Sequence, residues 1–226
     1  MKIYAFIFAR GGSKGLPRKN ILPLKGLPLI AHSINTAKKI KEIDKIFVST
    51  DDTEIANISK IYGAYIINRP KNLASDNSSE WDAWKHAVKW VEKKYGNFDI
   101  FLSLPATSPL RSCDDVKNCL NRLDDNLDIV ITTTPAKRNP WFNMVSKNKS
   151  GEVSLAFKGK KIVRRQDAPE LFDICTIAYV TRPSHIIRSK GLWDGKVGDV
   201  SIDPRRSIDI DTELDFEIAS LLINNN

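Results

Sequence analysis

The sequence predicts an α/β protein with one open, mostly parallel β-sheet flanked by helices, and three observations lead to this prediction. The chain has 226 residues, and a domain of this length can still be built around a single hydrophobic core. Short apolar runs alternate with longer amphipathic stretches, which is the pattern of repeated strand–helix units. The first run, residues 3–8, turns at once into a glycine-rich basic segment. This predicts a buried first strand and not a signal peptide.

Hydrophobic periodicity then places the other elements along the chain. The segment 79–94 carries Trp81 and Trp84 at helical spacing, so we expect both rings in the core. Thr53 is expected to open the second helix. The product is a Rossmann-like sheet whose ligand lies beyond the carboxyl ends of the strands, near a switch in strand order. The predicted strands are 3–8, 45–49, 64–67, 99–104 and 128–133, and the predicted helices are 29–40, 52–62, 79–94, 114–123 and 213–223.

The pattern weakens between residues 135 and 163. This part is made of short pieces rich in Lys, Asn and Gly. Such pieces predict hairpin-like structure, and we expect an inserted β-arm there. The whole chain, 1–226, is expected to form a single domain that carries this arm.

Composition and charge limit the classes of function. The chain is 42% hydrophobic and 27% charged, as in ordinary globular proteins. A net charge of +8 suits a nucleic acid, a membrane surface or a polyanionic small substrate, and it cannot choose among them. No apolar run approaches the roughly 20 residues needed to span a bilayer. The cysteines Cys113, Cys119 and Cys175 lack metal-ligand spacing, and we expect a reducing cytoplasm.

The segment 10–20, RGGSKGLPRKN, combines three glycines with four cations directly after the first strand. Glycines bring backbone N–H groups close to a ligand, and Arg and Lys neutralise the oxyanions that those groups hold. A triphosphate needs such a loop. The segment is neither a Walker A motif nor the dinucleotide fingerprint, because the glycine spacing differs from both. The alternative is a basic surface turn.

A pair of carboxylates lies near the other end of the chain. In an extended stretch, residues two apart point to the same side, so Asp209 and Asp211 can both face one cation. A hard ion such as Mg²⁺ is held by one or two carboxylates together with phosphate oxygens. The alternative is that Asp211 and Glu213 only cap the final helix.

Three further loops offer polar groups for binding. Residues 69–76 and 104–111 follow predicted strands, where polar side chains and proline form a rigid edge. Residues 164–170 supply arginines, whose planar guanidinium groups pair with both oxygens of a carboxylate. Each of these loops, taken alone, can also be structural.

Together these motifs resemble the CMP-N-acylneuraminate synthetases, which activate sialic, pseudaminic or legionaminic acid. The chain departs from that pattern at Pro105-Ala106, at 175–177 and at Glu80, and the first two departures concern the acceptor sugar or the base. The motifs that carry the resemblance are 9–20, 49–51 (STD), 69–70 (RP), 107–111 (TSPLR), 165–166 (RQ), 178–179 (AY) and 207–211 (SIDID).

The resemblance implies a reaction and a set of roles. The anomeric hydroxyl of an acidic keto-sugar attacks the α-phosphorus of CTP and pyrophosphate leaves, so catalysis is mainly positioning and charge neutralisation. Asp209 and Asp211 are implied as Mg²⁺ ligands with Lewis-acid help from the metal. Residues 135–195 are implied to form a dimerisation arm, so a homodimer is expected. The implied catalytic residues are Lys14, Arg10, Asp209 and Asp211. The residues implied to bind the nucleotide are Arg10, Gly11, Gly12, Ser13, Lys14, Lys19, Asn20, Arg69, Asp76, Thr107 and Ser108. Those implied to bind the sugar are Arg111, Arg165, Gln166 and Tyr179.

Two other functions stay open at this point. One is a cytidylyltransferase for a different acceptor, such as Kdo, a sugar phosphate or a phosphonate. The other is a basic nucleic-acid-binding protein, although the chain lacks a helix-turn-helix, zinc or RNP pattern. We therefore expect CTP and a sugar acid as partners, with neither nucleic acid nor membrane.

Overall fold

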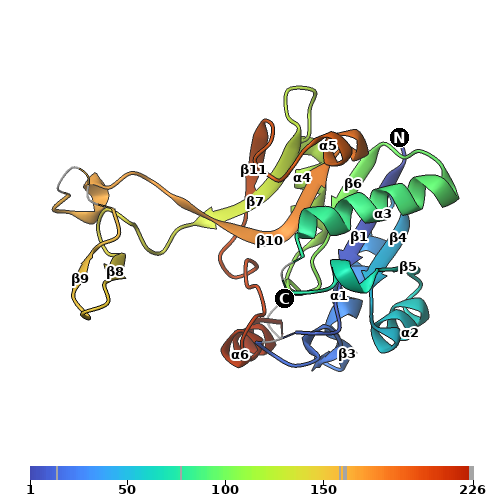
Figure 1. Ribbon diagram of the computed structural model, residues 1–226, viewed down its shortest axis with the longest axis horizontal. Helices are drawn as coiled ribbons and strands as arrows, with labels where there is room; N and C mark the ends of the chain where they lie inside the picture. Colours follow the sequence, from blue (N-terminus) through green and yellow to red (C-terminus); the bar gives the residue numbers. More distant parts are fainter. Residues whose placement is uncertain (14, 77, 158, 160–161, 224–226) are drawn as a thin grey trace.

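The computed structural model describes residues 1–13, 15–76, 78–157, 159 and 162–223. A seven-stranded sheet with the order β11-β7-β10-β6-β1-β4-β5 forms its centre (Figure 1). Strand β10 runs antiparallel to both of its neighbours, and the other strand pairs are parallel. The predicted α/β class with one mostly parallel sheet is confirmed. The strands are β1 (Ile3–Phe8), β4 (Ile43–Thr50), β5 (Tyr65–Asn68), β6 (Ile100–Ser103), β7 (Ile129–Pro135), β10 (Phe172–Thr181) and β11 (Val197–Ser201).

Helices cover both faces of the sheet because the inner strands are apolar on both sides. From β1, Ile3 and Ile7 face α1 (Leu29–Lys38), α2 (Thr53–Ile61) and α4 (Cys113–Arg122). Tyr4 and Phe6 face the other side, where they join α3 (Glu80–Tyr95) and α5 (Pro183–Arg188). The predicted burial of Trp81 and Trp84 is confirmed, since they are 6% and 2% exposed. Two cores therefore hold the sheet between them.

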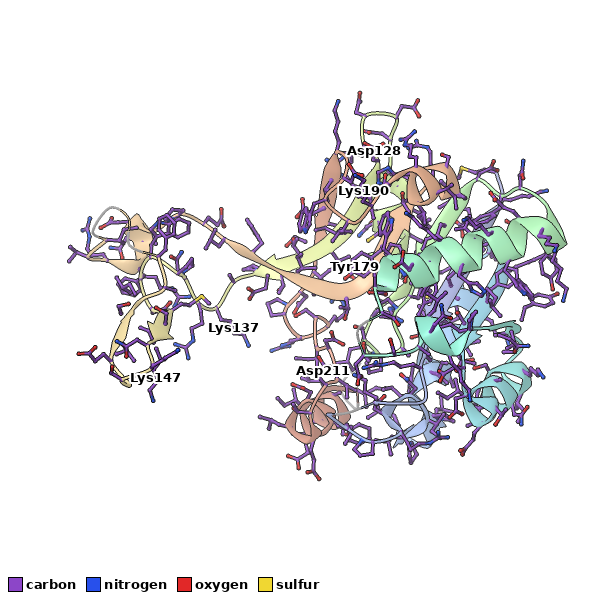
Figure 2. All side chains as sticks on the ribbon, in the orientation of Figure 1. Asp128, Lys137, Lys147, Tyr179, Lys190 and Asp211 are labelled. Carbon is purple, nitrogen blue, oxygen red and sulfur yellow. The ribbon has the colours of Figure 1, made fainter. Side chains whose placement is uncertain are left out.

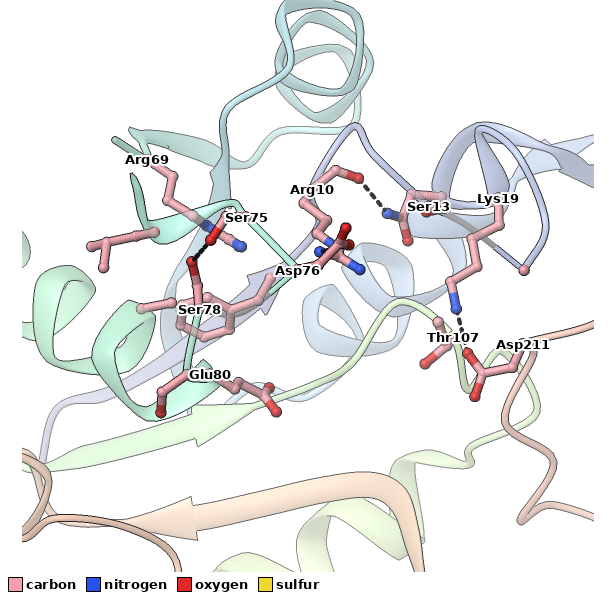
Figure 3. Close-up of a pocket in the computed structure, with 16 residues that line it drawn as sticks. Arg10, Ser13, Lys19, Arg69, Ser75, Asp76, Ser78, Glu80, Thr107 and Asp211 are labelled. Atoms are coloured by element: carbon pink, nitrogen blue, oxygen red, sulfur yellow. Dashed lines mark hydrogen bonds and ion pairs between the residues drawn. The ribbon is translucent and has the colours of Figure 1, made fainter. Parts of the chain in front are cut away.

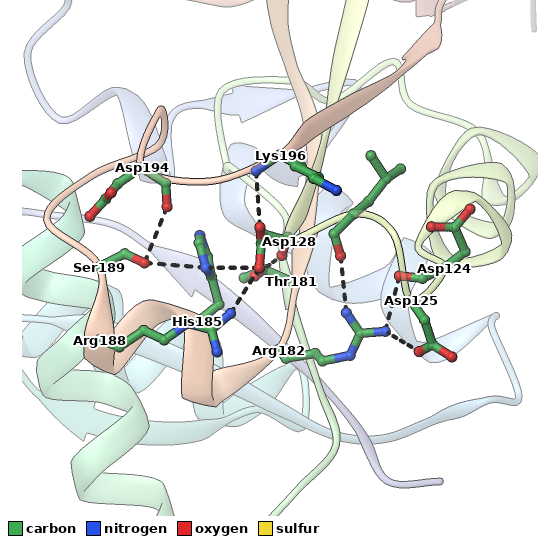
Figure 4. A network of polar contacts seen from close by, with 11 residues as sticks. Asp124, Asp125, Asp128, Thr181, Arg182, His185, Arg188, Ser189, Asp194 and Lys196 are labelled. Carbon is green, nitrogen blue, oxygen red and sulfur yellow. Dashed lines mark hydrogen bonds and ion pairs between the residues drawn. The ribbon is translucent and has the colours of Figure 1, made fainter.

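Helix α5 is tied to the start of β7 by a polar network around Asp128 (Figure 4). Arg188 donates to Asp128 Oδ1 at 2.8 Å, and the backbone N–H of Lys196 donates to Oδ2 at 2.9 Å. The buried His185 lies 3.6 Å from the same carboxylate. This network fixes α5 against the sheet although the helix has only six residues.

The predicted elements agree with the observed ones to within a few residues, and the differences have physical causes. β10 escapes prediction because its alternation is interrupted by a register shift between Cys175 and Val180. α5 is too short to show a helical stripe, and β11 is a short edge strand that reads VGDVS. Thr53 does not cap α2; Asp52 does, by accepting hydrogen bonds from the N–H groups of Glu54 and Ile55.

A slender arm projects from the main body between β7 and β10 (Figure 1). Its tip is the hairpin of β8 (Val145–Lys147) and β9 (Val153–Leu155), so the inserted β-arm is observed. The arm is shorter than the predicted 135–195. Within that range, β10 pairs with β7 and β6, and α5 packs against α3.

The strand order creates a switch point at the carboxyl ends of the strands. The chain leaves β1 toward β4 on one side and leaves β6 toward β7 on the other. The loops that follow β1 and β6 therefore run in opposite directions. Ligands bind between such loops in open α/β sheets. Within the part of the chain described here, no helix has the length and apolar character required to cross a membrane.

Candidate active site

A polar pocket of about 380 Å³ lies at this switch point (Figure 3). It is built from the loops after β1, β5 and β6, from the first turn of α3 and from the segment before α6 (Glu213–Leu222). Of the residues predicted for the site, it brings together Arg10, Ser13, Lys19, Asn20, Arg69, Asp76, Thr107 and Asp211.

Two glycines of the 10–20 loop are required by close approach. A Cβ on Gly11 would lie 2.7 Å from the Asp52 carboxylate, and the Gly11 N–H donates to Asp51. A Cβ on Gly15 would lie 2.4 Å from the Asp211 carbonyl oxygen. The loop is therefore pressed between the end of β4 and the segment that carries the acidic pair, as glycine allows.

Three cationic side chains of the pocket form ion pairs or hydrogen bonds with neighbouring residues. Arg10 forms an ion pair with Asp76 at 2.8 Å, and Lys19 forms one with Asp211 at 2.6 Å. Arg69 donates to the Ser49 carbonyl at 2.6 Å. Burial lowers the pKa of Arg69 to about 10, so this side chain keeps its charge at neutral pH. Of these cations, the glycine loop supplies Arg10 and Lys19, and each is paired with a carboxylate that lines the pocket.

Asp211 lines the pocket beside Lys19, and Asp209 lies two residues before it in the chain. Between them Ile210 is fully buried, and its N–H donates to the Thr107 carbonyl at 2.9 Å. Asp209 Oδ1 is buried and accepts no hydrogen bond from the described residues, whereas Asp211 is exposed. The helix-cap alternative for Asp211 is wrong, because Thr212 and Asp215 form the capping box of α6.

These two carboxylates fit a hard divalent cation. A buried carboxylate oxygen that accepts no hydrogen bond from the described residues, such as Asp209 Oδ1, requires an explanation, and an ion is one. No cluster of three or more acidic, His or Cys side chains suited to a metal occurs among the described residues. The remaining ligands of such an ion would be phosphate oxygens and water, as is usual for Mg²⁺.

Glu80 adds a third carboxylate at the start of α3. It lines this pocket and also a neighbouring cavity of about 220 Å³, which Trp81, Trp84 and Tyr179 line as well. Glu80 is exposed, but the protein packed around its carboxylate raises its pKa, and a hydrogen bond from Trp84 opposes this. Burial likewise raises the pKa of Tyr179. Tyr179, predicted for the sugar side, thus lies next to the main pocket and not inside it.

Arg111, predicted for the sugar side, does not line either cavity. The residue is 5% exposed, and its guanidinium donates to Ile177 O at 2.8 Å, to Ser33 Oγ at 2.5 Å and to Pro105 O at 2.5 Å. Ser108 is also buried, with its hydroxyl 2.7 Å from that of Thr176.

The arm holds the remaining predicted residues of the sugar side. Arg165 and Gln166 are exposed in a short 3₁₀ turn, Arg165–Asp167, beside a cavity of about 480 Å³ at the base of the arm. In Figure 2, Lys137 and Lys147 mark the arm, which stands apart from Tyr179 and Asp211 in the body. One copy of the chain therefore does not bring its own Arg165 to its own pocket. Lys14, a predicted catalytic residue, lies outside the described residues.

Sequence reasoning missed part of the pocket. Ser78 and Ser79 lie just beyond the predicted loop 69–76 and form a hydroxyl-rich rim with Ser75 of that loop. The Ser75 and Ser78 hydroxyl oxygens are 2.7 Å apart. Their clustering before a helix was the available signal. Phe8 and Ala83 line the pocket too, but apolar residues in a strand and a helix carry no sign of ligand contact.

Comparisons with known proteins agree with this geometry. The family model described as "Cytidylyltransferase" matches residues 4–187. The chain is 34% identical to post-translational flagellin modification protein B of Campylobacter coli, over 98% of this chain and 95% of that protein. It is 34% identical to CMP-N,N'-diacetyllegionaminic acid synthase of Campylobacter jejuni subsp. jejuni, over 99% and 95%.

A solved structure shows the same fold. It is a CMP:2-keto-3-deoxy-manno-octonic acid synthetase complexed with CTP, with a TM-score of 0.72, 19% identity, and coverage of 100% of this chain and 99% of that chain. The family model matches most of the sequence, and two relatives are 34% identical to it over nearly its full length. The chain belongs to the cytidylyltransferase family.

Proposed function

We propose that this cytidylyltransferase transfers the cytidylyl group of CTP to a nonulosonic acid, a sialic-type keto-sugar, to form a CMP-sugar and pyrophosphate. The observation that carries the proposal is the meeting of the cationic glycine loop with Asp211 in one pocket. Asp209, two residues earlier, has a buried oxygen that accepts no hydrogen bond from the described residues. A triphosphate needs donors and cations, and a divalent ion needs carboxylates; this pocket supplies both.

The nucleotide side is the wall formed by the β1 loop. Arg10 and Lys19 neutralise phosphate oxygens, and Ser13 lines their path. Gly11 and Gly12 belong to the same loop, in which the Gly11 N–H is engaged by Asp51. Two hydrogen bonds to Ser49 hold Arg69 in place. Arg69 contacts the nucleotide. Cations aimed at the phosphates and fixed before the reaction lower the barrier because no reorganisation is needed when charge develops. Lys14, Asn20, Asp76 and Thr107 complete this side.

Asp209 and Asp211 are the residues that hold Mg²⁺. The ion, when bound, supplies charge neutralisation and Lewis-acid help at the reacting phosphate. The chain itself contributes the orientation of the two carboxylates, which the buried Ile210 fixes from the other side.

The acceptor side is the cavity beside Tyr179, together with groups from a second copy. Both Trp81 and Leu192 line this cavity, and Lys190 adds a cation. Arg165 and Gln166 lie on the arm, so we propose that the arm of a partner protomer carries them to the acceptor carboxylate. Exposed apolar side chains on and near the arm support a homodimer: Val145, Val153, Phe157, Phe172 and Ile174 are each at least 45% exposed. The three cysteines are unpaired, which supports the expected cytoplasmic location.

The acceptor is tested by pyrophosphate release from CTP and Mg²⁺ with four acids offered separately: N-acetylneuraminic, pseudaminic, legionaminic and Kdo. We expect one nonulosonic acid to exceed Kdo in kcat/KM by at least about 100-fold, because missing polar contacts in a fitted site cost that much or more. Release with Kdo as the best substrate would overturn the acceptor assignment while leaving the cytidylyltransferase class in place.

A further inference from the structure

Lys19 is engaged with the acidic wall of the pocket. Its ammonium donates to Asp211 Oδ1 at 2.6 Å and to the Ile210 carbonyl at 2.9 Å (Figure 3). The Lys19 side chain is 16% exposed, whereas that of Asp211 is 71% exposed. The ammonium therefore lies against a carboxylate that is itself open to the pocket.

The backbones on either side of this ion pair are locked together. Gly15 approaches the Asp211 carbonyl so closely that no Cβ fits between them. Leu16 packs in the same apolar cluster as Ile208 and Ile210. Because neither backbone can withdraw, the four-carbon stem of Lys19 is the part that can move.

If the proposed function holds, the Lys19 ammonium and the divalent ion compete for Asp211. An ammonium at 2.6 Å from Oδ1 neutralises the carboxylate and repels a second positive charge placed there. Phosphate oxygens of the nucleotide offer Lys19 an alternative partner in the same pocket. A move of the ammonium from carboxylate to phosphate frees Asp211 for a divalent ion.

We propose that the Lys19 ammonium holds the place of the divalent cation at Asp211, so that triphosphate and metal bind cooperatively. This inference rests on the roles proposed above for Lys19 and Asp211. Triphosphate raises metal affinity by drawing Lys19 away, and linkage requires that the metal raise triphosphate affinity by the same factor. The protein then takes up nucleotide and metal together and keeps Asp211 neutralised until they arrive.

The test is Mn²⁺ binding to the full-length protein without nucleotide, measured by the loss of the free-ion EPR signal. Lys19→Met removes the competing ammonium. Arg10→Met is the matched control, because Arg10 lines the same pocket but pairs with Asp76. Lys19→Arg keeps the charge, and the double variant Lys19→Met with Asp211→Asn removes the proposed ligand. Near-UV circular dichroism checks that each variant is folded.

We expect Lys19→Met to bind Mn²⁺ at least about fivefold more tightly than the unmodified protein, the low end of measured couplings between sites. Arg10→Met and Lys19→Arg should change the affinity less than twofold, and the double variant should lose the gain. Equal Mn²⁺ affinity in the unmodified protein and Lys19→Met, or an equal gain in Arg10→Met, would overturn the inference alone. Absence of Mn²⁺ binding in every variant would overturn it together with the proposed metal site.

Discussion

Arg111 shows how a single buried cation can organise a site that it does not line. Its guanidinium joins α1, the loop after β6 and β10 through Ser33, Pro105 and Ile177. Burial lowers the pKa of Arg111, and the negative charge of Asp209 opposes this effect. The residue therefore lies within the electrostatic reach of the acidic pair while its donors are all engaged by the protein.

We predict that Arg111→Lys is destabilising and leaves the acceptor KM unchanged. Lysine cannot reproduce the planar fork, and each buried acceptor left without a partner costs about 1 to 3 kcal/mol. Urea unfolding gives the stability and steady-state kinetics give the KM. Arg165→Lys is the comparison variant, because it should raise the acceptor KM at unchanged stability. A variant Arg111→Lys with normal stability and a raised acceptor KM would restore the predicted sugar contact.

Residue types were predictable at this scale, but side-chain directions were not. Arg10 and Lys19 stood out because a glycine-rich run with cations after a strand has few structural uses. Arg111 shares that residue type and lies in a loop after a strand, yet it points inward, since buried carbonyl groups around it need a donor. No pattern along the chain distinguishes these two cases.

At the scale of elements, the segment before α6 is anchored to α4 by one ion pair. Arg206 makes two hydrogen bonds to Asp115, at 2.8 and 3.0 Å, and Asp115 also belongs to the capping box of α4. Arg206 comes just before residues 207–211, which carry the acidic pair. Helix α4 thereby positions the segment for which we propose metal binding.

We predict that Asp115→Asn lowers the free energy of unfolding at pH 7 by about 1 to 3 kcal/mol, between the values for surface and buried pairs. Burial alone would raise the pKa of Asp115, but hydrogen bonds from Arg206 and Ser112 outweigh it and lower the pKa. A lowered carboxyl pKa stabilises the fold above the unfolded value of about 3.9, and this stability is lost as pH falls.

The difference between Asp115→Asn and the unmodified protein should therefore shrink below about pH 4. Urea unfolding at several pH values measures it. The exposed neighbour Asp114 provides the control Asp114→Asn, which should change stability by a few tenths of a kcal/mol at most, as for a surface charge in a first turn. A destabilisation by Asp115→Asn that is independent of pH would contradict the role of the ion pair.

Elements with a strong period were predictable, whereas those fixed by tertiary context were not. β1 is Ile3–Phe8 as expected, and α3 differs by one residue at each end from the prediction. β10 contains Asp173 and Thr176, which break the apolar run. Its place between β6 and β7 depends on pairing across the sheet, which single-sequence periodicity does not contain.

At the scale of the whole molecule, the arm separates Arg165 from the pocket of its own chain. If a partner's arm completes each site, one dimer contains two sites that each combine both protomers. Mixing Arg165→Ala with Asp211→Asn protein then creates dimers with one intact site. We predict that two nearly inactive variants recover about a quarter of full activity after random exchange of protomers in a closed twofold dimer.

Analytical ultracentrifugation gives the oligomeric state for that experiment. Val153→Asp, at the exposed tip of the arm, serves as a second variant because it places a charge where the apolar contact is proposed. It should shift the protein toward a monomer. A dimer whose mixed variants recover no activity would show that the arm joins the protomers without completing the partner's site.

The central claim is that Asp209 and Asp211 act on CTP bound along the glycine loop. The most direct measurement is CMP-sugar formation from α-³²P-labelled CTP, Mg²⁺ and the preferred acid, for Asp209→Asn against the control Asp203→Asn. Asp203 is exposed in the turn before the acidic segment, where it accepts a hydrogen bond from the Arg205 N–H. We predict a loss in kcat of at least about 100-fold for Asp209→Asn, because the charge stabilisation it provides in the transition state is removed, and normal activity for Asp203→Asn. Unchanged product formation in Asp209→Asn would contradict the account.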